Sequence, residues 1–288
     1  MLKIATAQYS MNKHSSLNAF KSNAEDWVKE AATHGARLVI FPEYGSIELV
    51  SLMTPEIQKN LAGQLKEIQK YKDDFLNCYL DLAKKYKVYI IAPSFPLELE
   101  GKYINRAFFI NPEGLYGYQD KQVMTRFEDE EWKVSSPDQR KLNVFDVDGV
   151  KVGISICFDV EFPDFSRELA LSGITLLIAP SCTETPAGMN RVHVGARARA
   201  LENQIYVAVS QTVGEVDYSE AIDRNTGMAA VYSTCDKGFP DDGIIVQGEV
   251  NYPKWVYADI RPDLVTNVRE NGSVLNFKKI TTLVKETK

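Results

Sequence analysis

One stretch of the sequence places a cysteine where a nucleophile could act. Residues 151–156 are apolar and β-branched, which predicts a buried strand, and Pro163, Phe165 and Leu169 predict a helix directly after it. Cys157 therefore falls at the turn between strand and helix. The N–H groups and partial positive charge of a helix start lower the pKa of a nearby thiol, which would make this cysteine reactive. The alternative is a small buried hydrophobic residue, which describes most free cysteines.

A cysteine nucleophile usually needs a base, and the histidines do not supply an obvious one. The chain has three histidines. His34 follows a predicted helix, His14 lies in a polar turn, and His193 lies early in another predicted helix. A Cys–His pair is therefore possible but is not signalled by position. No two histidines have the spacing of metal ligands, so we predict no metal site.

Two charged residues at the ends of predicted strands are better candidates. Glu43 directly follows the apolar run 36–42, and Lys121 follows the second strand of a predicted hairpin, 115–119. Residues at the carboxyl ends of strands line the ligand crevice of open α/β sheets. Because Cys157 also ends its strand, the three side chains could meet. Taken singly, each charged residue could also be the solvated start of a loop.

The elements that would position these residues follow an α/β pattern. Alternation predicts a strand over 2–9, helical spacing predicts a helix over 17–33, and the run 36–42 predicts the next strand. Such a β-α-β unit implies parallel strands with a right-handed crossover. Turn sequences at 111–114 and 148–149 predict antiparallel hairpins. We therefore predict an α/β fold with more than one sheet layer.

The remaining segments set the domain organisation. Residues 121–143 show no clean periodicity and predict a long charged loop, and such loops in compact domains are usually functional or mobile. Residues 244–250 and 255–260 predict a late antiparallel pair of strands. We expect a single domain over 1–260 and a C-terminal arm over 261–288 that could pack on a partner subunit.

Composition argues against several classes of partner. The chain has 288 residues, 44% hydrophobic and 25% charged, as in ordinary globular proteins. Its formal net charge of −6 argues against nucleic acid and anionic membranes as partners. The first residues lack the apolar core of a signal peptide, and no stretch approaches the roughly 20 apolar residues of a membrane span. Four cysteines without a C-x-x-C pair predict a reduced, cytoplasmic protein.

Three motifs in chain order carry a family resemblance. They are Phe41-Pro-Glu43, Asp120-Lys121 after a hairpin, and Gly153-Ile-Ser-Ile-Cys157-Phe-Asp159 before a Phe-Pro helix. With the opening Ala5-Thr-Ala-Gln8 and the helix 197–203, they make nearly the whole chain resemble the carbon–nitrogen hydrolase (nitrilase) superfamily. The segment 124–132 resembles its generic amidohydrolase branch. The resemblance implies a four-layer α-β-β-α sandwich of two mixed sheets, and a homodimer or higher homo-oligomer.

The resemblance also implies roles for individual residues. Glu43 corresponds to the general base, Lys121 to the cation that stabilises the oxyanion, and Cys157 to the nucleophile of a Glu–Lys–Cys triad. A second glutamate is implied between the lysine and the cysteine. We favour Glu131, which lies 26 residues before the cysteine and close to the family pattern. Glu128 is the alternative.

The chain departs from the family pattern within the same loop. Val123 stands where the family often has a histidine, and Pro137-Asp138 stands where it often has Pro-Gly. These departures leave the substrate class and the alignment of the loop open, but they do not touch the triad.

Substrate contacts are predicted from residues that follow or flank the implied site. We expect the site to be lined by Tyr44, Trp132, Phe158, Glu161 and Thr183, with Glu184 as a further candidate. The acidic run Glu128-Asp-Glu-Glu131 is typical of a solvated loop. The sharper hypothesis is that some of its carboxylates favour a cationic substrate, such as an amino-alkyl amide.

Together these implications predict a hydrolase that needs no metal or organic cofactor. It would cleave the non-peptide C–N bond of a small linear amide to a carboxylic acid and ammonia or an amine, through a cysteine thioester. Hydrolysis of a nitrile or of an N-carbamoyl group is the main alternative. A non-catalytic binding member of the family is the alternative from another class. The physiological substrate and the oligomer size stay open.

Overall fold

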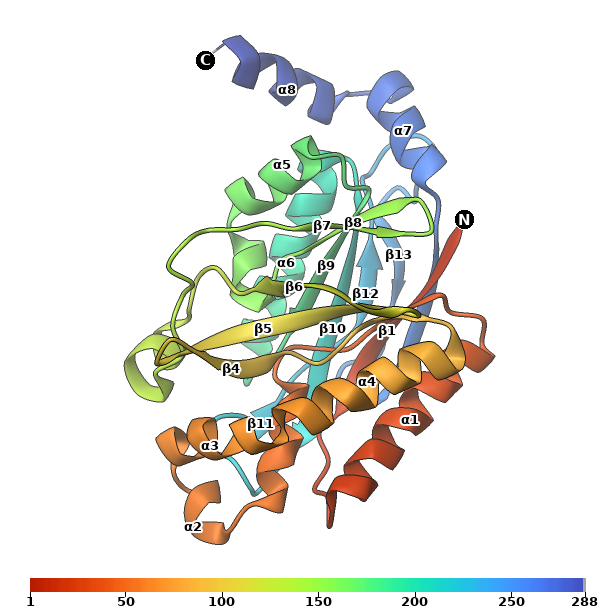
Figure 1. Cartoon of the computed structure of the whole chain (residues 1–288). Coiled ribbons are helices and arrows are strands. Elements are labelled where there is room, and N and C mark those ends of the chain that lie inside the picture. Colours follow the sequence, from red (N-terminus) through yellow and green to blue (C-terminus); the bar gives the residue numbers. More distant parts are fainter. Residues whose placement is uncertain (287–288) are drawn as a thin grey trace.

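The strand β1 (Leu2–Ser10) connects the two sheets of the molecule. Its first half pairs in parallel with β2 (Leu38–Ile40), and its last residues pair in parallel with β10 (Tyr206–Glu215). Its other edge pairs antiparallel with β14 (Lys254–Ile260). The computed structural model, which describes residues 1–286, is therefore a four-layer α-β-β-α sandwich whose two mixed sheets are joined by hydrogen bonds between β1 and β10 (Figure 1). The predicted fold class is confirmed.

Each sheet combines parallel and antiparallel pairs. The first sheet continues from β2 through β3 (Tyr89–Ile91) to β5 (Lys102–Asn111), which also pairs with β4 (Phe95–Leu99) and β6 (Gly114–Asp120). The second sheet continues from β10 in two directions. One runs through β9 (Leu176–Ser181), β8 (Val150–Ile154) and β7 (Val144–Val147), and the other through β12 (Ala230–Tyr232) and β13 (Ile244–Gln247). The short β11 (Arg224–Asn225) pairs with the end of β10.

Alternating side chains divide the first sheet between two hydrophobic cores. In β2, Leu38 and Ile40 pack in a core that also holds Ile178 and Val207 of the second sheet. The residue between them, Val39, packs in the other core with the helices. Successive side chains of a strand point to opposite faces, so a run that is apolar throughout is buried on both. Burial of each such side chain contributes roughly 1.5–3 kcal/mol.

Two pairs of helices cover the outer faces of the sheets. Helices α1 (Leu17–Thr33) and α4 (Lys72–Tyr86) lie side by side on the first sheet, and α5 (Pro163–Leu171) and α6 (Pro186–Asn203) cover the second (Figure 1). The bounds of α1 agree with the sequence prediction because both ends carry clear signals. Ser16 caps its first turn by accepting the N–H of Ala19, and Gly35, with φ +80°, ends it.

The region between β2 and β3 is helical and is divided into several pieces. It contains the short α2 (Pro55–Gln58), then α3 (Leu61–Ile68) and α4. A 3₁₀ stretch, Gly45–Leu52, lies before α2. Asn60 accepts the N–H of Gly63 and starts α3 as a separate helix.

The predicted pairing of the strands over 244–250 and 255–260 is wrong, although both strands exist. β13 pairs with β12, and β14 pairs with β1. The connecting segment carries the chain from one sheet to the other instead of turning back on itself. Gly248 packs against Gln8 so closely that a Cβ there would lie 1.5 Å from the amide oxygen of Gln8. Tertiary contact, not local turn chemistry, therefore decides this connection.

The predicted loop over 121–143 contains an element that the sequence pattern does not indicate. Residues Phe127–Trp132 form a π-helical turn in which Glu128 and Trp132 are buried. A π-helical turn has i→i+5 hydrogen bonds and is frequent at functional sites. Its two buried residues, Glu128 and Trp132, lie four positions apart, and Glu131 between them is exposed.

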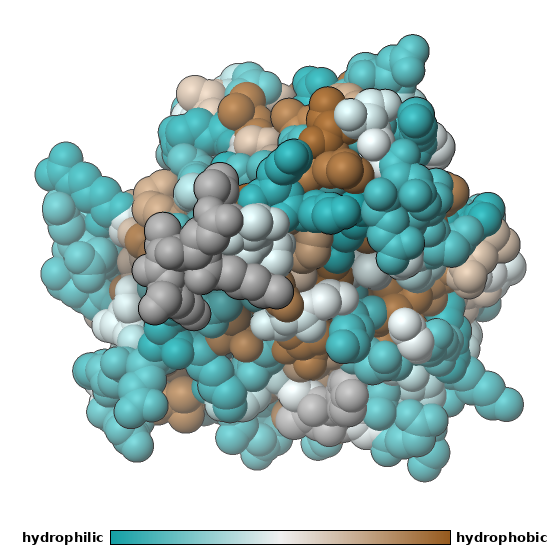
Figure 2. Space-filling model, turned by 90° about the horizontal axis from the view of Figure 1, so that it is seen from above, coloured by the Kyte–Doolittle hydropathy of each residue, from teal (hydrophilic) through white to brown (hydrophobic). Residues whose placement is uncertain are grey.

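The C-terminal arm consists of two helices, α7 (Pro262–Asn271) and α8 (Asn276–Glu286). Val265 and Val268 of α7 are both fully buried, and Val265 packs in the core that also holds Ile178 and Val207. The guanidinium of Arg269 lies 3.8 Å from the centre of the Phe277 ring and joins the two helices. Seen from this end, the surface is mostly hydrophilic, with apolar atoms in separate patches (Figure 2). Packing of the arm on a partner stays a prediction. No helix of the described residues is long and apolar enough to cross a membrane.

Candidate active site

The structure brings the three predicted strand-end residues into one buried cluster. Glu43 follows β2, Lys121 follows β6, and Cys157 lies just beyond β8. The ammonium Nζ of Lys121 lies 2.8 Å from Glu43 Oε1. All three side chains are at least 95% buried, so their interactions act with little screening by water.

Three donors hold the carboxylate of Glu43. Its Oε1 accepts hydrogen bonds from Lys121 and from the side-chain amide of Asn105 at 2.9 Å, and its Oε2 accepts the backbone N–H of Cys182 at 2.9 Å. Burial raises the pKa of Glu43, while the charge of Lys121 and hydrogen bonds from Lys121 and Cys157 oppose that rise. A carboxyl with a raised pKa next to a thiol suits proton transfer near neutral pH. Asn105 lies inside β5, where the sequence carries no signal of this contact.

The second glutamate at the lysine is Glu128, so the choice of Glu131 is wrong. Glu128 Oε2 lies 2.6 Å from Lys121 Nζ and accepts the N–H and the hydroxyl of Thr125. Glu131 is exposed on the outer side of the same π-helical turn and contacts neither Lys121 nor Cys157 in the described residues. Spacing along the chain does not reveal which carboxylate faces inward.

The two carboxylates keep the lysine charged. Burial alone would lower the pKa of Lys121, but Glu128 and Glu43 outweigh this effect and hold it well above its usual value. Burial likewise raises the pKa of Glu128, and the charge of Lys121 reverses that shift so that the net change is downward. The resting site therefore contains a lysine ammonium paired with the Glu128 carboxylate.

Cys157 begins a 3₁₀ turn, Cys157–Glu161, with φ +49°, an unusual backbone conformation for a residue other than glycine. The expectation of a lowered thiol pKa is wrong. Burial and the negative charge of Glu43 raise the pKa of Cys157 well above its ordinary value, although Lys121 opposes them. Helix α5 begins only at Pro163, so its N-terminus does not reach the thiol directly. The resting cysteine is a thiol that needs a base.

Tyr44 and Trp132 pack against the cluster and do not line the cavity. Their prediction as substrate contacts is therefore wrong. The phenol of Tyr44 donates to Glu128 Oε1 at 2.7 Å, and the ring of Trp132 packs on it with a centroid distance of 4.7 Å. Tyr44 has φ +54° and directly follows Glu43. Glu43, Tyr44, Glu128 and Lys121 thus form a closed ring of covalent and hydrogen-bonded links.

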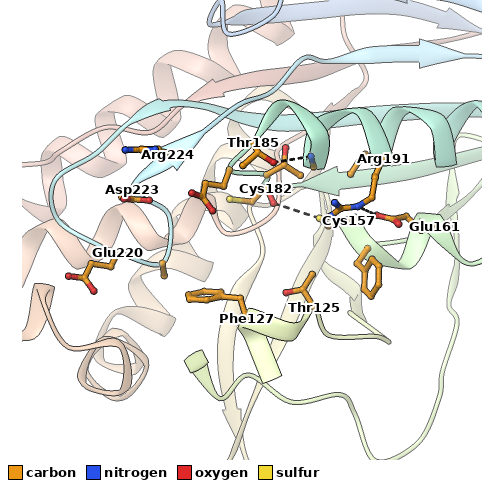
Figure 3. A pocket seen from close by; sticks show the side chains of 16 residues that line it. Thr125, Phe127, Cys157, Glu161, Cys182, Thr185, Arg191, Glu220, Asp223 and Arg224 are labelled. Carbon is orange, nitrogen blue, oxygen red and sulfur yellow. Dashed lines mark hydrogen bonds and ion pairs between the residues drawn. The ribbon is translucent and has the colours of Figure 1, made fainter. Parts of the chain in front are cut away.

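A cavity of about 270 Å³ opens at Cys157 (Figure 3). The predicted contacts Phe158, Glu161 and Thr183 line it, as does Glu184. Glu161 lies beside Cys157 and pairs with Arg191 of α6, at 3.2 Å, and sequence reasoning did not find Arg191. Further residues that it missed line the remaining wall, with the last three farthest from Cys157 in Figure 3: Thr125, Phe127, Cys182, Glu220, Asp223 and Arg224.

The acidic run 128–131, which suggested a cationic substrate, does not face the cavity at Cys157. Glu128 binds Lys121, and Glu130 pairs with Arg126 at the surface. No residue of the run 128–131 lines this cavity. The carboxylates on the cavity wall belong to other segments, and they outnumber the guanidinium groups four to two.

The histidines occupy structural positions. His14 lies 3.2 Å from the buried Glu48, and His193 bridges Tyr232 and Gln211. His34 lies at the end of α1. Within residues 1–286 none of the three contacts Cys157, whose thiol donates to the backbone carbonyl of Cys182 at 3.7 Å. The carboxylate of Glu43, whose negative charge helps to raise the pKa of Cys157, is therefore the candidate base. No group of three or more potential metal ligands occurs among the described residues.

Comparisons with known proteins agree with this fold. A family model described as carbon-nitrogen hydrolase matches residues 3–269. The probable hydrolase YhcX of Bacillus subtilis is 34% identical over 277 residues, which cover 96% of this chain and 53% of that protein. The chain thus spans about half the length of this relative. The human omega-amidase NIT2 is 28% identical over 265 residues, 90% of this chain and 88% of that protein. A carbon-nitrogen hydrolase structure from Helicobacter pylori superposes with a TM-score of 0.78, at 19% identity, over 96% and 94% of the two chains.

Proposed function

Because the chain belongs to the carbon–nitrogen hydrolase family, we propose that it hydrolyses a small linear amide to a carboxylic acid and ammonia or an amine. The observation that carries this proposal is the buried ion cluster of Glu43, Lys121 and Glu128 beside a thiol that opens on a cavity. Buried charges are costly to maintain, and perturbed ionisable groups collect at functional sites. The cavity is small, which favours a small substrate.

In the first half of the reaction, Glu43 takes the proton of Cys157 as the sulfur attacks the amide carbon. The C–S bond forms, and the electron pair of the carbonyl moves to oxygen. The ammonium of Lys121 and the backbone N–H of Phe158 stabilise that oxyanion. The oxyanion then collapses, the C–N bond breaks, and Glu43 returns its proton to the departing nitrogen. A thioester on Cys157 remains.

In the second half, water replaces the amine. Glu43 takes a proton from the water molecule as the water oxygen attacks the thioester carbon, and Lys121 again stabilises the oxyanion. The C–S bond breaks, the acid leaves, and Cys157 recovers the proton. Glu128 contributes by pairing with Lys121, so that the ammonium stays charged and pointed at the reacting carbon. Every proton that Glu43 accepts is returned within the cycle.

The charge of the cavity wall bears on the substrate class. The cavity lining contains four carboxylates and two guanidinium groups, and one of the guanidinium groups, that of Arg191, is paired with Glu161. The carboxylates are those of Glu161, Glu184, Glu220 and Asp223, and the second guanidinium is that of Arg224. An anionic substrate would therefore be repelled more than a neutral or cationic one. We propose amides without net negative charge, and an amide panel at fixed ionic strength tests this. Equal rates for matched anionic and cationic amides would remove the proposal.

Intact-protein mass spectrometry combined with ammonia detection tests the reaction. Incubation with an amide or an electrophilic probe should add mass at Cys157, and Cys157→Ala should show neither the adduct nor ammonia release. Cys235→Ala, at an exposed cysteine away from the cavity, is the matched control and should behave as the unmodified chain does. Nitriles and N-carbamoyl compounds belong in the same panel, since faster turnover of either would reassign the substrate. An adduct on Cys182 or Cys235 with none on Cys157 would contradict the mechanism.

We also propose that the chain forms a homodimer or a higher homo-oligomer. Large apolar side chains are exposed on neighbouring helices: Leu171 of α5 is 43% exposed, and Val194 and Leu201 of α6 are 68% and 44% exposed. Val194 and Leu201 lie two turns apart on one face of α6, which would suit packing against another copy. Light scattering on the purified chain measures the mass directly, and a monomeric mass at micromolar concentration would contradict this proposal.

A further inference from the structure

Asp159 is a buried carboxylate that the reaction above does not use. It is the third residue of the 3₁₀ turn that begins at Cys157, and only 2% of it is exposed. Its Oδ1 accepts the backbone N–H of Val123 at 2.9 Å, and the backbone N–H of Gln122 is shared between Oδ1 at 3.1 Å and Oδ2 at 3.0 Å. Both oxygens therefore bind peptide groups, and Asp159 is not among the residues that line the cavity.

The two peptide groups that Asp159 binds are the first two after Lys121. The N–H of Lys121 itself donates to the carbonyl of Asn105 at 2.9 Å, within the pairing of β5 and β6. The main chain is thus fixed on the strand side by Asn105 and on the loop side by Asp159. A buried N–H without an acceptor is costly, so the chain beyond Lys121 must stay where the carboxylate of Asp159 is.

This arrangement links the two residues whose separation matters most for the reaction. Asp159 lies two residues from the nucleophile, and its partners lie one and two residues from the lysine. We propose that Asp159 is a positioning residue that sets the distance between the ammonium of Lys121 and the thiol of Cys157. The inference rests on the proposed function, because that distance matters only if Lys121 stabilises charge at the carbon that Cys157 attacks.

Burial of Asp159 has a clear electrostatic cost. Burial raises the pKa of Asp159 to about 7, while the bonds from Gln122 and Val123 and the charge of Lys121 lower it and the charge of Glu43 raises it. A neutral amide at this position would avoid that cost but would offer only one acceptor oxygen and place an NH₂ group against a peptide N–H. A carboxylate therefore accepts from both peptide groups with both of its oxygens, whereas an amide would set its NH₂ group against the N–H of Gln122.

Asp159→Asn is the variant that tests the role, since it keeps the shape of the side chain. We expect kcat for the best amide to fall about 10- to 100-fold with KM changed less than about threefold, because a small displacement of a catalytic group has effects of this size. Asp164→Asn, at an exposed aspartate in the first turn of α5, is the matched control and should leave both constants unchanged. Retained kcat in Asp159→Asn, within about threefold, would overturn the inference.

A second readout separates displacement of the lysine from simple loss of charge. The rate of alkylation of Cys157 by iodoacetamide, followed over pH, reports the pKa of the thiol. Lys121 lowers that pKa. If Lys121 is displaced, the midpoint of the alkylation rate against pH therefore moves to higher pH. Removal of the negative charge of Asp159 alone would move this midpoint to lower pH or leave it unchanged. A lower or unchanged midpoint would overturn the inference even if kcat falls.

The alkylation readout also separates this inference from the proposed function. If the unmodified chain hydrolyses no amide, the proposed function fails, yet the alkylation midpoint still reports whether Asp159 holds Lys121 near Cys157. Should Asp159→Asn not fold, by circular dichroism, Asp159→Glu keeps the charge and moves the oxygens by one methylene. That variant should show the same loss of kcat and the same rise in the midpoint, and native values for both would overturn the role.

Discussion

Glu43 and Glu48 lie five positions apart, and both are completely or almost completely buried, at 1% and 0% exposure. Burial is the largest cause of a raised pKa in each. Their surroundings differ. Glu43 meets a lysine ammonium and a thiol beside a cavity, whereas Glu48 is closed in by the phenol of Tyr9, the ring of His14 and the N–H of Asn12. A buried carboxylate with a raised pKa is therefore not in itself a mark of catalysis.

The distinguishing feature is what lies on the open side of the carboxylate. Glu43 interacts with Cys157, and Cys157 lines the cavity. A proton that Glu43 accepts from the thiol can therefore pass to a substrate in the cavity. Glu48 joins β1, the 3₁₀ stretch that contains it and the loop before α1, and so it stabilises the fold next to the site. Activity and stability should separate cleanly between these two glutamates.

The largest expected effect is on Glu43→Gln. Loss of a general base lowers rates by about 10²- to 10⁴-fold. We expect kcat to fall by that amount, while the circular dichroism spectrum stays native because glutamine keeps an acceptor for Lys121. Steady-state ammonia release measures the rate. Glu48→Gln, assayed in parallel, should keep kcat within about threefold, and an equal loss in both variants would erase the comparison.

The next effect sharpens which carboxylates belong to the site. Glu128→Gln removes the charge that pairs with Lys121, and we expect kcat to fall about 100-fold, the size of effect that follows a small misplacement of a catalytic group. Glu131→Gln, three residues further on and exposed, should change kcat less than about twofold, as surface substitutions usually do. The same ammonia assay compares the two. A larger loss in Glu131→Gln would restore the assignment that the sequence favoured.

Stability is the quantity that Glu48→Gln should change. The amide would place an NH₂ group against the N–H of Asn12 or the hydroxyl of Tyr9, and one unsatisfied buried group costs about 1–3 kcal/mol. We expect the free energy of unfolding in urea to fall by that amount. Glu131→Gln serves again as the surface control and should unfold at the native urea midpoint. A native midpoint in Glu48→Gln would show that its bonds contribute little.

The smallest effect is the pH dependence of that stability difference. Glu48 has a raised pKa in the folded chain because of burial. Its contribution to stability is therefore fully present below the unfolded value, about 4.3, and is lost as pH rises through the folded pKa. The difference between the free energies of unfolding of the unmodified chain and Glu48→Gln should therefore narrow as pH rises above the unfolded pKa of glutamate. Urea titrations at several pH values measure it, and a difference that widens with pH would contradict the sign.

Much of the fold and part of the site could be predicted from the sequence because local signals were strong. Buried strands are apolar runs, and the capped helix α1 ends where its serine and glycine indicate. Parallel strands place their carboxyl ends together, so residues after strands are natural candidates, and the structure brings Glu43, Lys121 and Cys157 into one cluster. This grouping of the three residues could be predicted because it depends only on where strands end, and the pattern of apolar residues shows those positions.

The features that could not be predicted depend on contacts between distant segments. Glu128 is held inward by Lys121 and by the phenol of Tyr44, 84 positions away, and neither contact can be read from the acidic run itself. Asn105 lies within β5 next to another polar residue, Arg106, and its role follows from Glu43, 62 positions away. The thiol pKa was predicted in the wrong direction because a helix start is visible in the sequence, whereas the burial that outweighs it is not.

The pairing of β1 with β14 also bears on how the chain folds during synthesis. Leu2 pairs with Ile260, so one edge of β1 stays unpaired until a strand more than 240 residues further along the chain has been synthesised. Non-local pairings of this kind slow folding and leave strand edges exposed while they wait. One edge of the segment 2–9 therefore stays without its strand partner until residues 254–260 have been synthesised. A chain shortened before residue 254 would keep that edge open and would aggregate through it.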